Sequence, residues 1–399
     1  MTLVMTPGSA VADRIGVEAA GRKLLAYCRE RDWAGYDPYD ALNSRWLESV
    51  PVLNAKIPRL VLTQALKRSP INVRPILRIP PTQNPKGLAL FLAALIKAPQ
   101  LATGIAEDLP AYLIDRLIAL RSPDTPYWCW GYSFAWQTRT QVVPRGTPNL
   151  VCTTFVADAL LDAFEARNDQ RCLAMAVSAT EYIRNELFRE EGDFAGFSYP
   201  LPSMSPRIFN ANLLAAGLFT RVAAITGDST LLAPAIKAAR YAVSRQRPDG
   251  SWPYGEADTQ QWIDNFHTGY NLAGLQTIGH HAKTDEFAGA VSRGFAFYIG
   301  HFIEENGAPR YFHNLLYPID AHCVSQSLIT LLSFKHLSPE AVSKARTVFE
   351  WTMRHMWDDE GYFYYRILRF GSIRTSYMRW AQAWMLLALA TCLHEGDVS

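Results

Sequence analysis

Four pairs of polar residues follow four glycines at similar distances, and their side chains could carry out acid–base chemistry. The glycines are Gly196, Gly250, Gly307 and Gly361, at steps of 54, 57 and 54 residues. The pairs are Asn210 and Asn212, Asp264 and His267, Asp320 and His322, and Arg374 and Tyr377. Each pair opens an otherwise apolar segment, where a helix is expected to begin. These residues are therefore either helix caps and core hydrogen-bonding groups or parts of one polar site.

The Asn, His, Tyr and Arg side chains together resemble the set found in toroidal uronate lyases and epimerases, and this resemblance implies the removal of a proton next to a carboxylate. Removing the proton at carbon 5 of a uronic acid requires neutralisation of the adjacent carboxylate, and Arg or Asn donors supply hydrogen bonds that strengthen as charge develops. A base then takes the proton, and imidazole or an activated phenol is suitable near neutral pH. The catalytic candidates are His267, His322, Tyr377, Asp264 and Asp320.

Cationic, amide and aromatic side chains on the same loops are candidates for binding a sugar. The aromatic rings could stack on pyranose faces or pack between hairpins, and the arginines could bind an anion or form surface ion pairs. The candidate substrate-binding residues are Asn210, Asn212, Trp252, Tyr254, Glu256, Trp262, Tyr270, His313, Tyr364, Arg366, Arg374, Arg379, Trp130 and Arg139.

A helical repeat must position these side chains. Each copy has a glycine, aromatic residues around a turn, a polar loop and a helix rich in small residues, and an earlier copy begins at Gly131. Amphipathic stretches between the copies, such as "DSTLLAPAIKAARYAVSRQ", have the three-to-four spacing of outer helices. Because the inner helices start alike, the polar pairs are expected at one height in a ring.

The repeat predicts an all-α fold, a closed ring of about six helical hairpins in one domain over residues 1–399. The clear hairpins occupy residues 107–395. Residues 1–106 form a divergent N-terminal portion with enough helical segments for a sixth hairpin. A closed ring has no exposed apolar end, so its first and last hairpins need no polar capping repeats.

This architecture resembles the (α/α)6-toroid enzymes, which include six-hairpin glycosidases, sugar epimerases, polysaccharide lyases and relatives of terpenoid cyclases. "RYAVSRQRPDGSW" resembles the glutamine-tryptophan repeat of terpene cyclases in this copy alone, and "WDDEG" lacks the spacing of their aspartate-rich motif. The aromatic-rich opening is similar to bacterial proteins linked to capsule and exopolysaccharide assembly. The resemblance implies a carbohydrate-active enzyme, of the epimerase or lyase type when combined with the polar pairs.

Three other functions remain open on the sequence. A glycoside hydrolase would need paired carboxylates, for which Asp264, Asp320 and Glu256 are candidates. A terpenoid-cyclase-like toroid and a non-catalytic, glycan-binding helical scaffold are the others. No spacing of His, Cys and Asp is diagnostic of a metal site, so neither a metal nor another cofactor is predicted.

The composition excludes several broad classes of function. The chain has 399 residues, 49% of them hydrophobic and 19% charged, and a formal net charge of +2, which gives no strong pull toward nucleic acid. Its six cysteines have no CxxC spacing, and no secretory signal or membrane-length apolar stretch is visible. We expect a soluble cytoplasmic protein whose partner is an acidic oligo- or polysaccharide, without a membrane span or nucleic acid.

Overall fold

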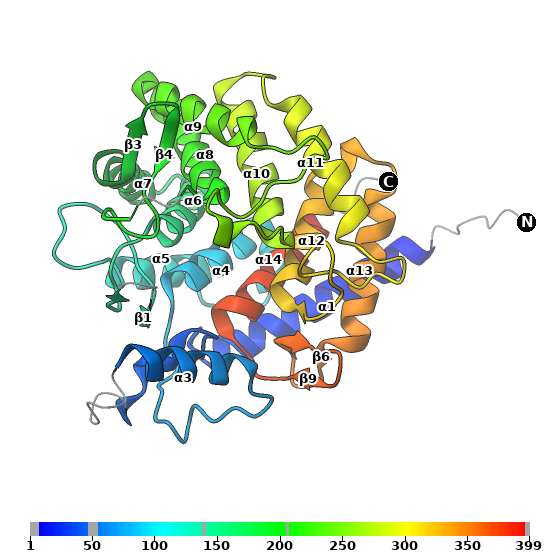
Figure 1. Ribbon diagram of the computed structural model, residues 1–399. Coiled ribbons are helices and arrows are strands. Elements are labelled where there is room, and N and C mark those ends of the chain that lie inside the picture. The colour runs from blue at the N-terminus through cyan, green and yellow to red at the C-terminus, as the bar shows by residue number, and fades with distance from the viewer. Residues whose placement is uncertain (1–7, 47–54, 138–140, 205–206, 396–399) are drawn as a thin grey trace, which may run out of the picture.

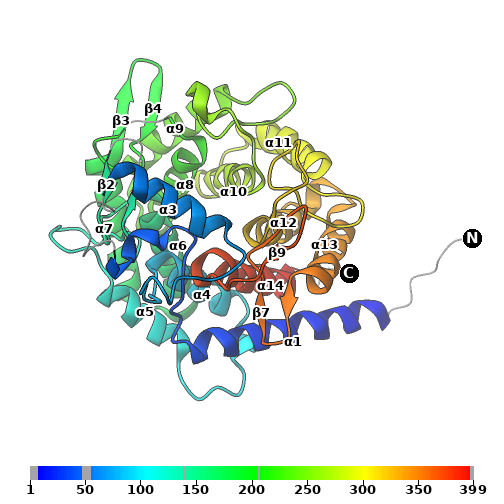
Figure 2. The ribbon, with the colours of Figure 1, turned by 60° about the horizontal axis from the view of Figure 1, so that its bottom comes forward.

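Twelve helices of the part of the chain that is described form two concentric layers (Figures 1 and 2). The computed structural model describes residues 8–46, 55–137, 141–204 and 207–395. The inner helices are α4 (Pro85–Lys97), α6 (Leu150–Arg167), α8 (Phe209–Thr226), α10 (Asn265–Ala282), α12 (Ala321–Ser333) and α14 (Ala383–Glu395). The outer helices are α1 (Gly8–Glu30), α5 (Leu109–Ala119), α7 (Gln170–Tyr182), α9 (Leu232–Ser244), α11 (Ala288–His301) and α13 (Ala341–His355).

The inner helices close into a ring, because each contacts the next and α14 contacts α4. Small residues allow this close approach: Gly274 of α10 lies so near Leu213 of α8 that a Cβ would meet the Leu213 carbonyl oxygen at 2.8 Å. The outer helices are amphipathic, and α13 buries Ala341, Ala345 and Val348 at helical spacing. The all-α ring of six hairpins, the (α/α)6 toroid expected from the repeat, is confirmed.

The sixth hairpin differs from the expectation, because it combines the two ends of the chain. α1 packs against α14, while α4 pairs with α5. The leading glycines show the same relation: a Cβ on Gly250 would meet α11, one on Gly307 would meet α13, and one on Gly361 would meet Lys23 of α1. α1 therefore occupies the place of the outer helix that would follow α14.

An additional helix, α3 (Lys56–Arg68), lies outside the two layers. With the 3-10 helix η1 (Asp40–Asn43) it sits at the bottom of Figure 1 and in front of the ring in Figure 2. α3 contacts η1 and the loop strand β1. The N-terminal portion therefore supplies an outer helix at one end and a cover on one face of the ring at the other.

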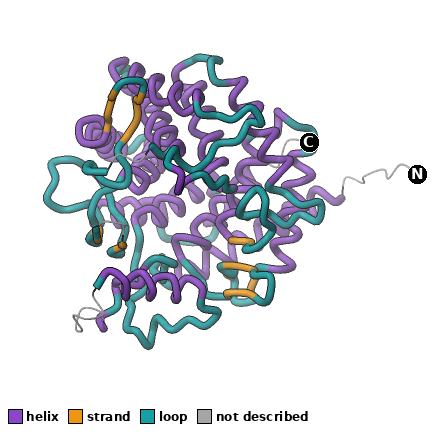
Figure 3. Tube along the Cα trace, viewed as in Figure 1, coloured by secondary structure: helices purple, strands orange, loops and turns teal. Residues whose placement is uncertain are grey.

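Strands are confined to loops in the part of the chain that is described (Figure 3). The antiparallel pairs are β1 (Trp136–Gln137) with β2 (Val142–Val143), β3 (Phe188–Glu191) with β4 (Phe194–Phe197), and β6 (Trp357–Asp358) with β7 (Tyr362–Phe363). β5 (Ile319–Asp320), β8 (Arg366–Ile367) and β9 (Ser372–Ile373) form a three-stranded sheet in that order.

Shorter helical turns complete the connections between the helices and strands. The turns are η3 (Pro99–Ala102), η4 (Ile183–Leu187), η5 (Ser229–Leu231), η6 (Asp258–Gln260), η7 (Lys335–Leu337) and η8 (Met378–Gln382).

None of the described helices is long and apolar enough to cross a bilayer. All six cysteines are free, and all but Cys392 are buried.

The turn glycines make a test of the repeat geometry. Gly250 has φ +90°, and a Cβ there would clash with the carbonyl oxygen of Arg293. We expect Gly250→Ala to lower the free energy of unfolding by about 1–3 kcal/mol, because it adds backbone strain and this clash. Gly300→Ala in α11, where nothing lies within 4 Å, is the matched control and should be neutral or stabilising. Equal urea midpoints for the two variants would contradict the geometry.

Candidate active site

A cavity of about 460 Å³ lies where the inner helices begin. The helix N-caps are Asn84, Asn149, Ile208, Asp264 and Asp320, and Tyr377 precedes η8 at the start of the last inner segment. The residue two positions after each of these lines the cavity; these six are Lys86, Val151, Asn210, Phe266, His322 and Arg379. The equal height expected of the inner helix starts is therefore seen in the lining of one cavity.

The first turn of each inner helix also explains why polar residues recur there. Asn84, Asn149, Asp264 and Asp320 each accept a hydrogen bond from a backbone N–H of the first turn. Such bonds satisfy donors that a helix start leaves unpaired. The two interpretations of the polar pairs are thus both partly right, because the cap residue fixes the first turn and the next residues face the cavity.

Asp264 and His267 form a carboxylate–imidazole pair at the start of α10. Oδ1 of Asp264 accepts the His267 backbone N–H at 3.0 Å, and Oδ2 lies 2.7 Å from His267 Nδ1 and 3.0 Å from Trp262 Nε1. The Asp264 side chain is 1% exposed and that of His267 is 22% exposed. With Nδ1–H donated to the carboxylate, Nε2 keeps a lone pair that can accept a proton from a molecule in the cavity.

His322 and Tyr270 form a second, fully buried pair. The Tyr270 hydroxyl lies 2.6 Å from His322 Nε2, and His322 Nδ1 has no hydrogen-bond partner among the described residues. Burial, with Lys86 and Arg379 nearby, holds the pKa of His322 well below its ordinary value, so that the ring is neutral at pH 7. Burial also raises the pKa of Tyr270, so that its hydroxyl stays protonated and can donate.

The two imidazoles are brought together by an aromatic cluster. The Phe266 ring lies 4.3 Å from the His267 ring and 4.4 Å from the His322 ring, measured between centroids. Tyr270 lies 6.1 Å from His267 and 6.0 Å from His322. Residues on adjacent helices, α10 and α12, therefore present two nitrogen bases at the same end of the ring.

Lys86 is the functional candidate that the sequence did not reveal. Its side chain is 4% exposed, and Nζ lies 4.0 Å from the centroid of Phe155, 5.3 Å from that of Trp384 and 5.7 Å from that of Tyr270. Burial, together with Arg379, lowers the pKa of Lys86 to about 7. In the sequence, Lys86 follows a helix-capping Asn and a Pro in "NPK", which begins α4. No glycine-aromatic turn precedes this segment, so the repeat did not mark it as a helix start at the site.

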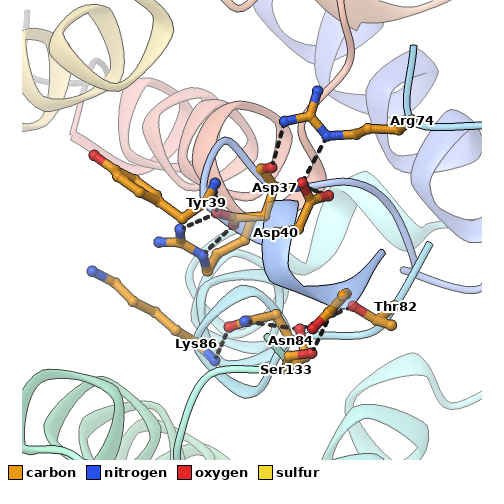
Figure 4. Close-up of polar contacts among 10 residues, drawn as sticks. Asp37, Tyr39, Asp40, Arg74, Thr82, Asn84, Lys86 and Ser133 are labelled. Atoms are coloured by element: carbon orange, nitrogen blue, oxygen red, sulfur yellow. Dashed lines mark hydrogen bonds and ion pairs between the residues drawn. The ribbon is translucent and has the colours of Figure 1, made fainter. Parts of the chain in front are cut away.

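Arg379 lines the cavity but is already paired. It donates two hydrogen bonds to Asp37, from Nε at 2.6 Å and from a terminal nitrogen at 2.8 Å. Asp40, three residues further on, accepts from Arg74 at 2.7 Å. Figure 4 shows this group of charges beside Tyr39, and shows Lys86 extending away from its contacts with Asn84. Among the described residues, Nζ of Lys86 donates no hydrogen bond.

Aromatic rings from the loops form the walls of the cavity. Of the predicted rings, Tyr254 and Trp262 line it and stack on each other, with centroids 4.7 Å apart. Asn210 also lines it, and its side-chain oxygen has no partner within the described chain. Trp136, a further loop tryptophan, lines it as well. The aromatic lining residues that the sequence analysis did not single out are Tyr39, Tyr132, Phe134, Tyr199, Phe266, Tyr311, Phe312 and Trp380. The sequence shows that the loops are rich in aromatic residues, but only the fold determines which of these rings face the cavity.

Two catalytic candidates lie outside the cavity lining. Asp320 is fully buried, and it accepts hydrogen bonds from Arg366 Nε at 2.6 Å and from Trp380 Nε1 at 2.8 Å. These bonds use both its oxygens, so Asp320 holds the loops and Arg366 in place. Tyr377 is also fully buried, and its ring lies against Arg74, 4.8 Å from the centroid. The prediction that these two side chains face the shared site is corrected.

Several predicted substrate-binding residues belong to the packing of the repeat. Trp130 and Trp252 lie in the core and donate to carbonyl oxygens of the preceding outer helix, those of Leu117 and Ala242. Asn212 is buried and accepts from the Phe197 backbone N–H at 2.9 Å. A ligand cannot reach these side chains without unpacking the hairpins.

The remaining predicted residues lie on the loops away from the cavity. Glu256 is held by Tyr241, Arg207 and Arg245. Arg374 is exposed over the Tyr364 ring, and His313 Nδ1 lies 3.4 Å from the Ile263 carbonyl oxygen; neither these three residues nor Arg366 lines the cavity. Arg139 lies outside the described residues.

The charged groups that line the cavity are few in the part of the chain that is described. Asp264 is its one carboxylate, and Lys86 and Arg379 are its cations, of which Arg379 is neutralised by Asp37. No group of three or more His, Cys, Asp or Glu side chains that could hold a metal ion is found among the described residues. The arrangement can therefore move protons with imidazole, phenol and amine groups.

Several solved structures with the same fold are named as enzymes that act on sugars. The cellobiose 2-epimerase of Spirochaeta thermophila is 15% identical with a TM-score of 0.61, covering 79% of this chain and 86% of that chain. A GH76 α-mannanase of Bacteroides thetaiotaomicron is 12% identical with a TM-score of 0.60, over 79% and 87%. A UGL variant with dGlcA-Glc-Rha-Glc is 12% identical with a TM-score of 0.60, over 98% and 97%.

At these identities the likeness shows the fold, an (α/α)6 toroid, and leaves the chemistry to the residues of this chain. No protein-family model matches the chain, and no curated protein matches it. The UGL likeness extends over nearly the whole chain, so it includes the N-terminal portion as well as the repeats.

The buried amine predicts a distinctive dependence of stability on pH. Because the pKa of Lys86 falls from 10.5 to about 7 on folding, the unfolded chain binds one more proton between these values. The free energy of unfolding should therefore gain about 1.4 kcal/mol per pH unit from this group as pH rises through the window. Lys86→Met should remove this contribution and be more stable than wild type at pH 6.

Lys97→Met is the matched control, because Lys97 ends the same helix outside the cavity. Urea unfolding at pH 6 and pH 10 measures the difference between the variants. An unchanged pH dependence in Lys86→Met would show that the amine is not desolvated.

Proposed function

We propose that the chain is a carbohydrate-active enzyme of the epimerase or lyase type. It removes a proton from a carbon next to a carbonyl or carboxyl group of an acidic saccharide, with carbon 5 of a uronate as the expected position. The observation that carries this proposal is the Asp264–His267 pair, whose second imidazole nitrogen has no hydrogen bond within the described chain and belongs to a ring that lines an aromatic cavity. The sugar-active enzymes that share the fold support it.

In this proposal His267 is the general base. Asp264 holds its tautomer and stabilises the imidazolium that forms when Nε2 takes the proton. Tyr270, whose hydroxyl is bonded to His322, returns a proton or protonates a leaving oxygen. Asn210 and Lys86 offer donors to the carboxylate or to the developing enolate, where a desolvated hydrogen bond has its largest effect.

The proposal that the substrate is acidic depends on Lys86. Of the arginines first assigned to the carboxylate, Arg366 and Arg379 are paired with buried aspartates and Arg374 lies outside the cavity. An amine that donates no hydrogen bond within the described chain and lines the cavity can donate to an anionic group without breaking an existing pair. Tyr254 and Trp262 supply a stacked surface of the kind that binds sugar faces.

A glycoside hydrolase with paired carboxylates is less well supported. Such an enzyme needs two carboxyl groups that flank one bond. Of its three candidates, Asp264 lines the cavity, while Asp320 is enclosed by Arg366 and Trp380 and Glu256 is held on the outer side by arginines. The imidazole pair therefore favours proton transfer at carbon over hydrolysis. We place this activity in glycan biosynthesis or processing in the cytoplasm, where unpaired cysteines are usual.

Replacing the base tests the proposal. His267→Gln should lower the rate of deuterium exchange into a uronate-containing oligosaccharide by about 10²–10⁴-fold, because general base catalysis typically contributes this much. His394→Gln is the control, since His394 is exposed at the end of α14. Proton NMR in deuterated water measures the rate, and circular dichroism checks the fold. A wild-type rate in His267→Gln would refute the assignment.

A further inference from the structure

Lys86 has an environment that suits a nucleophile. Its Nζ lies at a cavity wall, is surrounded by the rings of Phe155, Tyr270 and Trp384, and donates to no described residue. The rings attract an ammonium ion, and this interaction would favour the charged form. Desolvation and the nearby Arg379 outweigh that attraction, and the pKa of Lys86 is about 7. A large fraction of the side chain is therefore free amine at neutral pH.

Nothing else in the described structure uses this amine. Asp37, the carboxylate whose charge acts on Lys86, is bound by Arg379 through two hydrogen bonds. Desolvation in an apolar pocket and a neighbouring cation are the two conditions that activate a lysine toward carbonyl compounds. Lys86 meets the first condition, and Arg379 contributes to the second although it is paired with Asp37. The start of the helix that carries Lys86 is fixed by the Asn84 cap.

We propose that Lys86 forms an imine with the aldehyde of a reducing sugar, so that the cavity also accepts free sugars in their open-chain form. This second activity would act at carbon 2, next to the imine carbon. It rests on the proposed function in one respect, the role of His267 as the base. A sugar acid such as glucuronate, with an aldehyde at one end and a carboxylate at the other, combines both substrate classes.

The step balances without an oxidant or a cofactor. The amine lone pair attacks carbon 1, a proton moves from nitrogen to oxygen, and the resulting hydroxyl leaves as water when the Tyr270 hydroxyl protonates it. The protonated imine then draws electrons from the carbon 2–hydrogen bond, and His267 Nε2 takes that proton. Return of the proton to carbon 2 regenerates the protonated imine. Water then adds to carbon 1 and gives one proton to the Tyr270 phenolate. The carbon–nitrogen bond breaks as the hydroxyl proton moves to nitrogen, which releases the sugar aldehyde and the free amine.

The placement of the groups agrees with this sequence of steps. The ring of Tyr270 lies 5.7 Å from Nζ of Lys86 and 6.1 Å from the ring of His267, measured to centroids. Its hydroxyl is backed by His322, which can exchange a proton with it. The nucleophile, the acid and the base therefore line one cavity around a single tyrosine.

Reductive trapping tests the proposal. The protein is incubated with glucuronate and sodium cyanoborohydride, and the modified lysine is located by peptide mass spectrometry. We expect about one sugar per chain on Lys86, formed at least 10-fold faster than on any surface lysine. Lys86→Met and Lys86→Arg should both lose this fast adduct, the second while keeping a positive charge, and Lys97→Met should retain it. Equal slow labelling of wild type and Lys86→Met would overturn the proposal.

A parallel exchange experiment separates this proposal from the proposed function. Deuterium entering glucuronate at carbon 5 without trapping on Lys86 would leave the proposed function standing and contradict the imine. Trapping on Lys86 without exchange at any carbon would support the imine and contradict proton transfer by His267. Exchange at carbon 2 that is lost in Lys86→Arg would support both.

Discussion

Ring closure is the constraint on which the rest of this structure depends. Once six inner helices close on each other, their first turns lie at one height, and the side chains just after their caps must face a common space. The repeat therefore builds a cavity from positions far apart in sequence, such as Lys86 on the first inner helix and Arg379 on η8, just before the last inner helix. Any substitution that opens the ring would separate the acid–base groups before it altered their chemistry.

Closure itself depends on the N-terminal portion. α1 takes the outer place beside α14, and Asp37 holds Arg379 by two buried hydrogen bonds across 342 positions of sequence. Breaking one partner of such a buried pair leaves an uncompensated charge, which costs several kcal/mol, about 3–5. The pair fixes the loop that carries Tyr39 to the cavity wall, and it removes one positive charge from the site.

The fold was predictable because the glycine turns repeat in the sequence, and the turns at Gly250, Gly307 and Gly361 pack on the next outer helix. The matched polar pairs include Asp264, His267, His322 and Asn210, and these four residues line one cavity in the structure. The sequence could not distinguish Asp320 from these residues, because its burial by Arg366 depends on the pairing of β5 with β8. Lys86 was missed because the start of α4 lacks the glycine-aromatic turn that marks the other copies.

The site that results has one carboxylate-backed imidazole, one buried imidazole–phenol pair and one desolvated amine, within aromatic walls. Its polarity is concentrated in groups that exchange protons, which is why proton transfer at a sugar carbon accounts for it better than hydrolysis does. A crystal structure with a uronate oligosaccharide soaked into the cavity tests this most directly. The account predicts a sugar carbon that bears the acidic proton within reach of His267 Nε2. A glycosidic oxygen placed against Asp264 instead, or a sugar bound only outside the ring, would contradict it.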